Sequence, residues 1–286
     1  MPSLISDGVE IVENFLSQSQ VVAINGELDK LFSPSYLSLN GFLGHVFVSK
    51  KYQTIALPTA SVKSVNLLEI ACDASDLIER ILPSNGRVLT ALEIWQEQGQ
   101  LEPLFWHTDN RDGAIRVFII LQGGQVDSGA FRYILGSRDE LDTALKHLSE
   151  GQILANKYYH NKPSSEYISS RADSVFVATA LPGAMVIADT KGIHSNLPRV
   201  KRRRILTMEF QLAETVDYPR STIYLPSSMI TQKVVANIEL FLNCSSSSPH
   251  PYGTDQVLTN PPTTQKKLVS RFLTYFFRIL RKIQMT

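Results

Sequence analysis

The sequence predicts a mainly β protein with flanking helices, and two observations carry that prediction. From residue 87 to about 213, short runs rich in Val, Ile, Leu and Phe alternate with turns containing Gly or Asp, as in an antiparallel sandwich or barrel. Before this region, apolar residues recur at helical spacing in two stretches. The predicted strands are residues 88–95, 115–121, 130–135, 174–180, 184–188 and 203–211.

The region before residue 87 is expected to contain a short strand and two helices. Val9, Ile11 and Val12 favour a strand, and Ser17 is a suitable N-cap for a helix that ends near residue 32. A second helix is expected from about residue 65 to 81. The long insertion between strands 130–135 and 174–180 should begin as a helix over 140–148 and continue as irregular chain.

Length and composition define the class of protein. The chain has 286 residues, which suits one large domain with appendages, and its 43% hydrophobic and 19% charged residues argue against wholesale disorder. The formal net charge of +1 indicates no nucleic-acid partner. Two distant cysteines, Cys72 and Cys244, are too few for a disulfide framework or a thiolate metal site. With no signal-peptide pattern at the N-terminus, the expected location is the cytoplasm.

Two further segments follow the predicted domain. Residues 245–264 are rich in Ser, Pro and Thr and are expected to form a flexible linker. Residues 265–286 combine apolar residues at helical spacing with Lys and Arg and without Asp or Glu, which predicts a basic amphipathic helix. Such a helix could contact a membrane surface peripherally or bind a partner protein, and packing back on the domain is the competing interpretation.

A candidate metal-binding set comes from two separate motifs. In FWHTDNRDG, His107 and Asp109 are two residues apart and therefore share one face of an extended segment. His194 lies after a strand and a turn in PGAMVIADTKGIHSN. Two His and one carboxylate form the facial triad of iron(II) oxygenases, which leaves three positions open. Downstream, a basic run over residues 201–204 offers a guanidinium fork for the carboxylate of a dicarboxylic acid.

The order of these motifs resembles the phytanoyl-CoA dioxygenase-like family of Fe(II)/2-oxoglutarate-dependent oxygenases. Further similar stretches are the opening DGVEIVENFLSQSQVVAINGELDKLF, the tetrapeptide WHTD, and DSGAFRYILGSR, where Leu135 and Arg138 stand at the family's Pro and His. The resemblance covers about residues 7 to 215. It implies a cupin-like jelly roll, the double-stranded β-helix, with its core at about 87–215 and a helical part at about 8–86 of an oxygenase domain spanning 1–240.

The resemblance also implies a function. The chain is expected to be a dioxygenase that uses Fe(II), 2-oxoglutarate and O2 to hydroxylate or otherwise oxidise a small organic molecule, with decarboxylation of 2-oxoglutarate to succinate. The metal ligands would be His107, Asp109 and His194. Because related halogenases have Ala or Gly at the carboxylate position, Asp109 favours oxygenation or desaturation. The alternatives are a non-catalytic jelly-roll binding protein and a cupin-type metal enzyme that does not use 2-oxoglutarate.

Two arginines compete for the 2-oxoglutarate carboxylate. The family register, counted back from Phe210, selects Arg203. Simple alternation instead puts Arg204 on the face of Leu206 and Met208. Arg203 is preferred because the family's sheet is covered on both sides, so that an apolar face need not line the cavity. After the distal His, either Ser195 or Asn196 is expected to add a hydrogen bond to the cosubstrate.

Overall fold

The computed structural model describes most of the predicted domain. The described residues are 1–31, 47–49, 54–58, 62, 64–83, 86–97, 99–109, 114–148, 161–212 and 231–237. The predicted linker 245–264 and the predicted basic helix 265–286 lie outside them. Within the described part of the chain, no helix is both long enough and apolar enough to span a bilayer.

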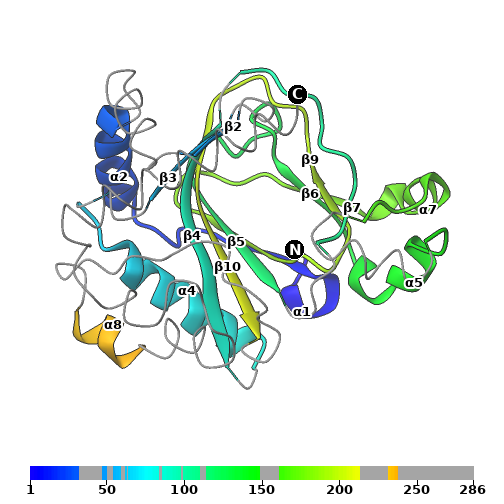
Figure 1. Cartoon of the computed structure of the whole chain (residues 1–286), viewed down its shortest axis with the longest axis horizontal. Helices are drawn as coiled ribbons and strands as arrows, with labels where there is room; N and C mark the ends of the chain where they lie inside the picture. Colours follow the sequence, from blue (N-terminus) through cyan, green and yellow to red (C-terminus); the bar gives the residue numbers. More distant parts are fainter. Residues whose placement is uncertain are drawn as a thin grey trace, which may run out of the picture.

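The described strands form two antiparallel sheets that face each other (Figure 1). The larger sheet has the order β1 (Val9–Val12), β8 (Met185–Asp189), β5 (Ile115–Gln122), β10 (Arg203–Leu212), β4 (Arg87–Glu97), β3 (Thr54–Pro58) and β2 (Phe47–Ser49). The smaller sheet has the order β7 (Val175–Ala178), β6 (Phe131–Ile134) and β9 (His194–Asn196). Most neighbours in the two sheets are far apart in sequence, as in a jelly roll, whereas β2 and β3 are close in sequence. The predicted mainly β fold is confirmed.

Two helices cover the outer face of the larger sheet, α2 (Gln18–Leu31) and α4 (Leu67–Ile81), opposite the smaller sheet (Figure 1). A capping box starts α2: the Ser17 Oγ accepts from the Gln20 N–H at 3.3 Å, and the Gln20 Oε1 accepts from the Ser17 N–H at 2.9 Å. The Asn66 side chain caps α4. Both helices match the sequence prediction. Shorter helices are α1 (Leu4–Asp7), α5 (Leu141–Ala144), α7 (Ser165–Ser170) and α8 (Gln232–Ala236).

Some elements differ from the prediction. The helix expected over 140–148 is a single turn, α5, that ends at Ala144. Strands β2, β3 and β9 and helices α1, α7 and α8 were not predicted. All are short, and β9, with the sequence His-Ser-Asn, has no apolar residue to indicate a strand. Strands β1, β2 and β3 show that the region before residue 87 also contributes to the larger sheet.

Strand β5 of the larger sheet buries apolar side chains on both of its faces, because successive side chains point to opposite faces. Val117, Ile119 and Leu121 pack into the core shared with α2 and α4. Phe118 and Ile120 point the other way, into a second core between the two sheets. A polar side chain on this sheet therefore enters either the helix layer or the space between the sheets, according to its register.

Tyr133 of β6 is a fully buried side chain at the edge of the intersheet core. Its hydroxyl donates a hydrogen bond of 2.9 Å to the Asp189 carbonyl, and the residue is 0% exposed. Burial is the main cause that raises the pKa of Tyr133 well above 10. The native state therefore keeps this phenol protonated at pH values where the unfolded chain has lost the proton.

We predict an alkaline loss of stability that depends on Tyr133. The stabilisation is complete below the unfolded pKa of about 10 and declines as the pH rises further, by up to about 1.4 kcal/mol per pH unit. Tyr133→Phe removes this proton, so its unfolding free energy should fall less steeply above pH 10, although it starts lower without the hydrogen bond. Urea unfolding at several pH values measures both slopes. Equal slopes would show that Tyr133 ionises as readily in the native state.

Candidate metal centre

The segment that contains His107 and Asp109 is placed by backbone pairing. The His107 N–H donates to the His194 carbonyl at 3.0 Å, and the His194 N–H donates back to the His107 carbonyl at 2.9 Å. The Asp109 N–H donates to the Thr190 carbonyl at 3.0 Å. Thr108 points to the opposite side, where its hydroxyl donates to the Lys191 carbonyl at 2.6 Å. His107 and Asp109 thus share one face beside His194.

Both imidazole rings are held by backbone carbonyls close in sequence. The Nδ1 of His107 lies 2.9 Å from the Phe105 carbonyl, and the Nδ1 of His194 lies 2.9 Å from the Gly192 carbonyl. A carbonyl oxygen can only accept, so each Nδ1 carries a proton, and the neutral form of each ring presents an unprotonated Nε2. Phe131 stacks on His194 with ring centroids 5.5 Å apart. The tautomer with the proton on Nδ1 leaves Nε2 free to bind a metal ion, as a metal-binding imidazole requires.

The Asp109 carboxylate completes the set. Its Oδ1 lies 4.0 Å from the Nε2 of His107 and 3.9 Å from the Nε2 of His194. Ligand atoms of all three residues lie within 4.8 Å of one another, and all three side chains are buried. Two imidazole nitrogens and one carboxylate oxygen match the donor set that non-haem iron(II) sites use. The chemistry of these donors therefore fits the metal that the sequence resemblance implies.

A buried ion-pair network adjoins Asp109, and the sequence analysis did not identify it. The Nη2 of Arg116 lies 3.2 Å from the Asp109 Oδ2 and 2.8 Å from the Oε2 of Glu209. Burial opposes the charge on Arg116, but the two carboxylates outweigh it and raise the pKa of the guanidinium. In the sequence, Arg116 and Glu209 stand out as charged residues within apolar strands. That the two form an ion pair could be known only from the register of the two strands.

A cavity of about 460 Å³ lies between the sheets, and two of the three candidate ligands border it. His107, His194 and Arg116 lie in its wall. The apolar part of the wall comes from both sheets and from the segment before His107, and includes Trp95, Phe118, Ile120, Phe131, Ile205, Leu104 and Phe105. A mostly apolar wall with a few charged groups is the usual composition of a small-molecule site.

A second charged cluster lies in the wall of the same cavity. The Nε and Nη2 of Arg203 lie 2.6 and 2.5 Å from the Oε2 of Glu97, and the Nη1 donates to the Gly129 carbonyl at 2.5 Å. The Nη1 of Arg199 lies 3.1 Å from the same Glu97 oxygen. All three charged residues are buried, and two guanidiniums share one carboxylate. The cluster therefore carries an excess positive charge. Arg199 was not singled out from the sequence.

The other candidate residues from the sequence lie on different faces of their strands, because neighbouring side chains in a strand alternate between its two faces. Arg204 enters the helix layer, where its guanidinium donates to Gln96 at 2.7 Å and to Asp29 of α2 at 2.7 Å. Asn196 lines the cavity, on the same face of β9 as His194. Ser195 is not part of the cavity wall: its hydroxyl donates to the Leu104 carbonyl at 2.5 Å.

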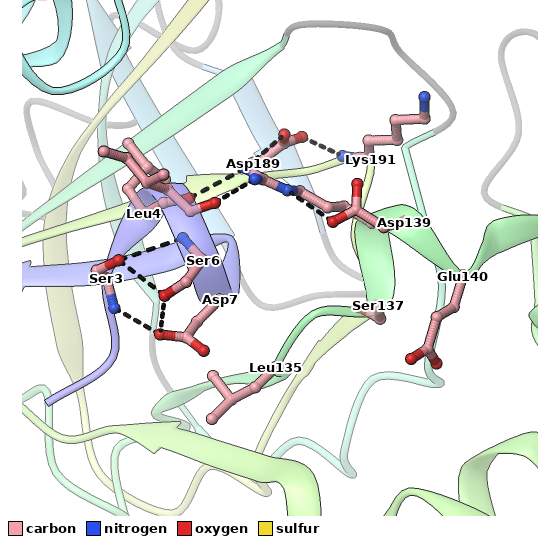
Figure 2. A network of polar contacts seen from close by, with 12 residues as sticks. Ser3, Leu4, Ser6, Asp7, Leu135, Ser137, Asp139, Glu140, Asp189 and Lys191 are labelled. Atoms are coloured by element: carbon pink, nitrogen blue, oxygen red, sulfur yellow. Dashed lines mark hydrogen bonds and ion pairs between the residues drawn. The ribbon is translucent and has the colours of Figure 1, made fainter.

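Polar contacts join the turn that carries His194 to the N-terminus, and Figure 2 shows the part of this network around Leu4, Asp7 and Asp189. The Ser137 hydroxyl accepts a hydrogen bond of 2.8 Å from the Ile193 N–H. The next residue, Arg138, donates to the Leu4 carbonyl at 3.0 Å and lies 3.8 Å from the Asp189 carboxylate. The Gly-Ser-Arg turn after β6 thus joins the first helix to the chain before His194.

Comparison with known proteins identifies the fold. No family model matches the chain, and no curated protein matches its sequence. EctD from S. alaskensis, solved with 2-oxoglutarate and 5-hydroxyectoine, is similar in structure with a TM-score of 0.54 and 16% identity, over 77% of this chain and 80% of EctD. The α-ketoglutarate-dependent carbocyclase SnoK from nogalamycin biosynthesis has a TM-score of 0.52 and 14% identity, over 76% and 84% of the two chains.

A third structure agrees with these two. HygX from Streptomyces hygroscopicus, solved with nickel and 2-oxoglutarate, has a TM-score of 0.51 and 9% identity, over 80% of this chain and 90% of HygX. The chain therefore has the double-stranded β-helix fold of these three proteins, and the fold that the sequence resemblance implied is confirmed.

We predict that Gly192→Ala disrupts the metal centre. A Cβ at this position would lie 1.6 Å from the Oη and 2.2 Å from the Cζ of the buried Tyr133 ring, so the turn must move and take with it the carbonyl that orients His194. Loss of such an orienting contact lowers metal affinity about 10–100-fold. Calorimetric titration with Co(II) measures it.

Gly26→Ala is the matched control, because a Cβ on this α2 residue meets nothing within 4 Å. It should leave Co(II) binding unchanged and stabilise the fold by about 0.5–1 kcal/mol, since alanine favours the helix. Wild-type Co(II) affinity in Gly192→Ala would mean that the Gly192 carbonyl does not position His194.

Proposed function

We propose that this protein is an Fe(II)- and 2-oxoglutarate-dependent dioxygenase that hydroxylates or otherwise oxidises a small organic molecule. The observation that carries the proposal is the convergence of two oriented imidazoles and one carboxylate, all buried, beside a cavity that both imidazoles line. His107, Asp109 and His194 would hold the metal. With 2-oxoglutarate bound, iron supplies the oxidising chemistry, coupling reduction of O2 to decarboxylation of the oxo acid to succinate.

The cosubstrate is proposed to use the Arg203 cluster. A 2-oxo acid that chelates the metal through its oxo end needs a cation for its distal carboxylate. Arg203 lies in the cavity wall, and with Arg199 and Glu97 it forms a cluster with one positive charge in excess, which suits a second carboxylate. Arg204 is paired with Asp29 in the helix layer. These contacts favour Arg203 over Arg204, and the wall position of Asn196 favours it over Ser195.

The chain's own residues would perform the remaining tasks. The apolar side chains of the cavity wall exclude water from the reacting atoms and accept the carbon skeleton of the substrate. Asp109 occupies the coordination position that a halogenating enzyme would need for a halide, so oxygenation or desaturation is the proposed outcome. The volume of the cavity, about 460 Å³, suits a small-molecule substrate.

The first prediction from this proposal concerns metal and cosubstrate together. Anaerobic addition of Fe(II) and 2-oxoglutarate to the protein should give the weak visible charge-transfer band of a chelated 2-oxo acid. His107→Ala should abolish the band, because it removes one of the three ligands. Admission of O2 should then yield succinate from the wild-type protein.

Each alternative gives a different result. A non-catalytic binding protein with this fold would show the band without forming succinate. A cupin-type metal enzyme would bind Fe(II) but give no band with 2-oxoglutarate. Absence of the band in the wild-type protein, with equal Fe(II) binding by His107→Ala, would refute the assignment of the metal site.

The second prediction separates the two arginines. Arg203→Ala should weaken 2-oxoglutarate binding more than tenfold, since a partly buried charge pair is worth roughly 2–5 kcal/mol. Glu97 retains Arg199 as its partner in this variant. Arg204→Ala should instead lower the unfolding free energy through its lost contacts with Gln96 and Asp29, with little effect on 2-oxoglutarate. Titration of the charge-transfer band and thermal unfolding measure the two effects, and the reverse ranking would transfer the role to Arg204.

A further inference from the structure

We propose that Arg116 is a positioning residue that reserves one oxygen of Asp109 for the metal by holding the other. This inference rests on the proposed function, because it assumes that the metal binds at His107, Asp109 and His194. Arg116 thereby sets the number of coordination positions that Asp109 occupies.

The two oxygens of Asp109 have different neighbours. Oδ1 faces the imidazoles, 4.0 Å from the Nε2 of His107 and 3.9 Å from that of His194. Oδ2 faces the guanidinium of Arg116, whose Nη2 lies 3.2 Å away. The Asp109 side chain is only 1% exposed, so solvent has little access to either oxygen. One oxygen of the carboxylate therefore faces the other two candidate ligands, and the other oxygen faces the Arg116 guanidinium.

Arg116 is held in place by the larger sheet. It lies on β5 directly opposite Glu209 of β10, and its Nη2 is 2.8 Å from the Glu209 Oε2. The other oxygen of Glu209 accepts a hydrogen bond of 2.6 Å from the Gln211 amide. A cross-strand ion pair of this kind is fixed by strand register. The position of the guanidinium beside Asp109 is thus built into the β5–β10 pairing.

This placement bears on how many positions stay open at the metal. Carboxylates bind metals through one oxygen or through both. A facial triad supports 2-oxo acid chemistry only while three positions remain open, two for the chelating oxo acid and one for oxygen. If Asp109 used both oxygens, one of those positions would be lost. By pairing with Oδ2, Arg116 keeps Asp109 to a single position at the metal.

The test measures metal and cosubstrate affinity separately in the full-length protein. In Arg116→Met, Co(II) should bind at least as tightly as in the wild type, because a nearby positive charge is lost and Oδ2 becomes available. The visible absorption of bound Co(II) should change with its coordination. Binding of 2-oxoglutarate to the Co(II) protein should weaken by about tenfold or more. Arg116→Lys, which keeps a cation near Oδ2, should recover most of that loss.

A second variant guards against a folding defect. Arg116→Met removes the cation that Glu209 and Asp109 share, whereas Arg116→Gln with Glu209→Gln removes both members of the cross-strand pair, so that Asp109 is the single carboxylate left in this group. It should show the same separation of Co(II) and 2-oxoglutarate affinities. Wild-type Co(II) absorption and 2-oxoglutarate affinity in these variants would overturn the role of Arg116, and so would parallel loss of both affinities. Failure of the wild-type protein to bind Co(II) would refute the proposed function itself.

Discussion

The candidate metal centre depends on the reciprocal pair of backbone hydrogen bonds between His107 and His194. These two residues exchange N–H to carbonyl contacts of 3.0 and 2.9 Å, although they lie in separate parts of the chain. A directly opposed pair in an antiparallel arrangement brings its side chains to the same face. Asp109 reaches that face because it lies two residues after His107. The ligand set is thus a product of main-chain pairing before any side chain contributes.

The second constraint is the covering of the larger sheet on both faces. Helices α2 and α4 pack on one face and the smaller sheet packs on the other, so that β5 and β10 bury apolar side chains on both sides (Figure 1). Adjacent residues of one strand then belong to different environments. Arg203 enters the cavity wall with Glu97, while Arg204 enters the helix layer with Asp29. One residue of register separates a candidate cosubstrate contact from a structural ion pair.

Supporting contacts surround the ligands in successive layers. The Phe105 and Gly192 carbonyls orient the two imidazoles, and Arg116 holds the outer oxygen of Asp109. Beyond them, Ser137 and its neighbours tie the turn before His194 to the first helix (Figure 2). Because most of these contacts use backbone groups or cross-strand pairs, the geometry of the centre is coupled to the stability of the jelly roll. Changes at Gly192 or Arg116 should therefore affect the metal without touching it directly.

The sequence by itself determined the mainly β class, the helices α2 and α4 and the candidates His107, Asp109 and His194, because periodicity, capping residues and short motifs are local properties. It preferred Arg203 to Arg204 only through the family register, and it did not single out Arg116, Arg199 or Glu97. Their roles follow from which strands lie side by side: Arg116 meets Glu209 only through the β5–β10 register, and Glu97 meets Arg203 only through the β4–β10 pairing. The pairing of strands that are distant in sequence is decided by the tertiary structure, because it depends on the burial of both faces of the sheet. No local sequence pattern predicts it.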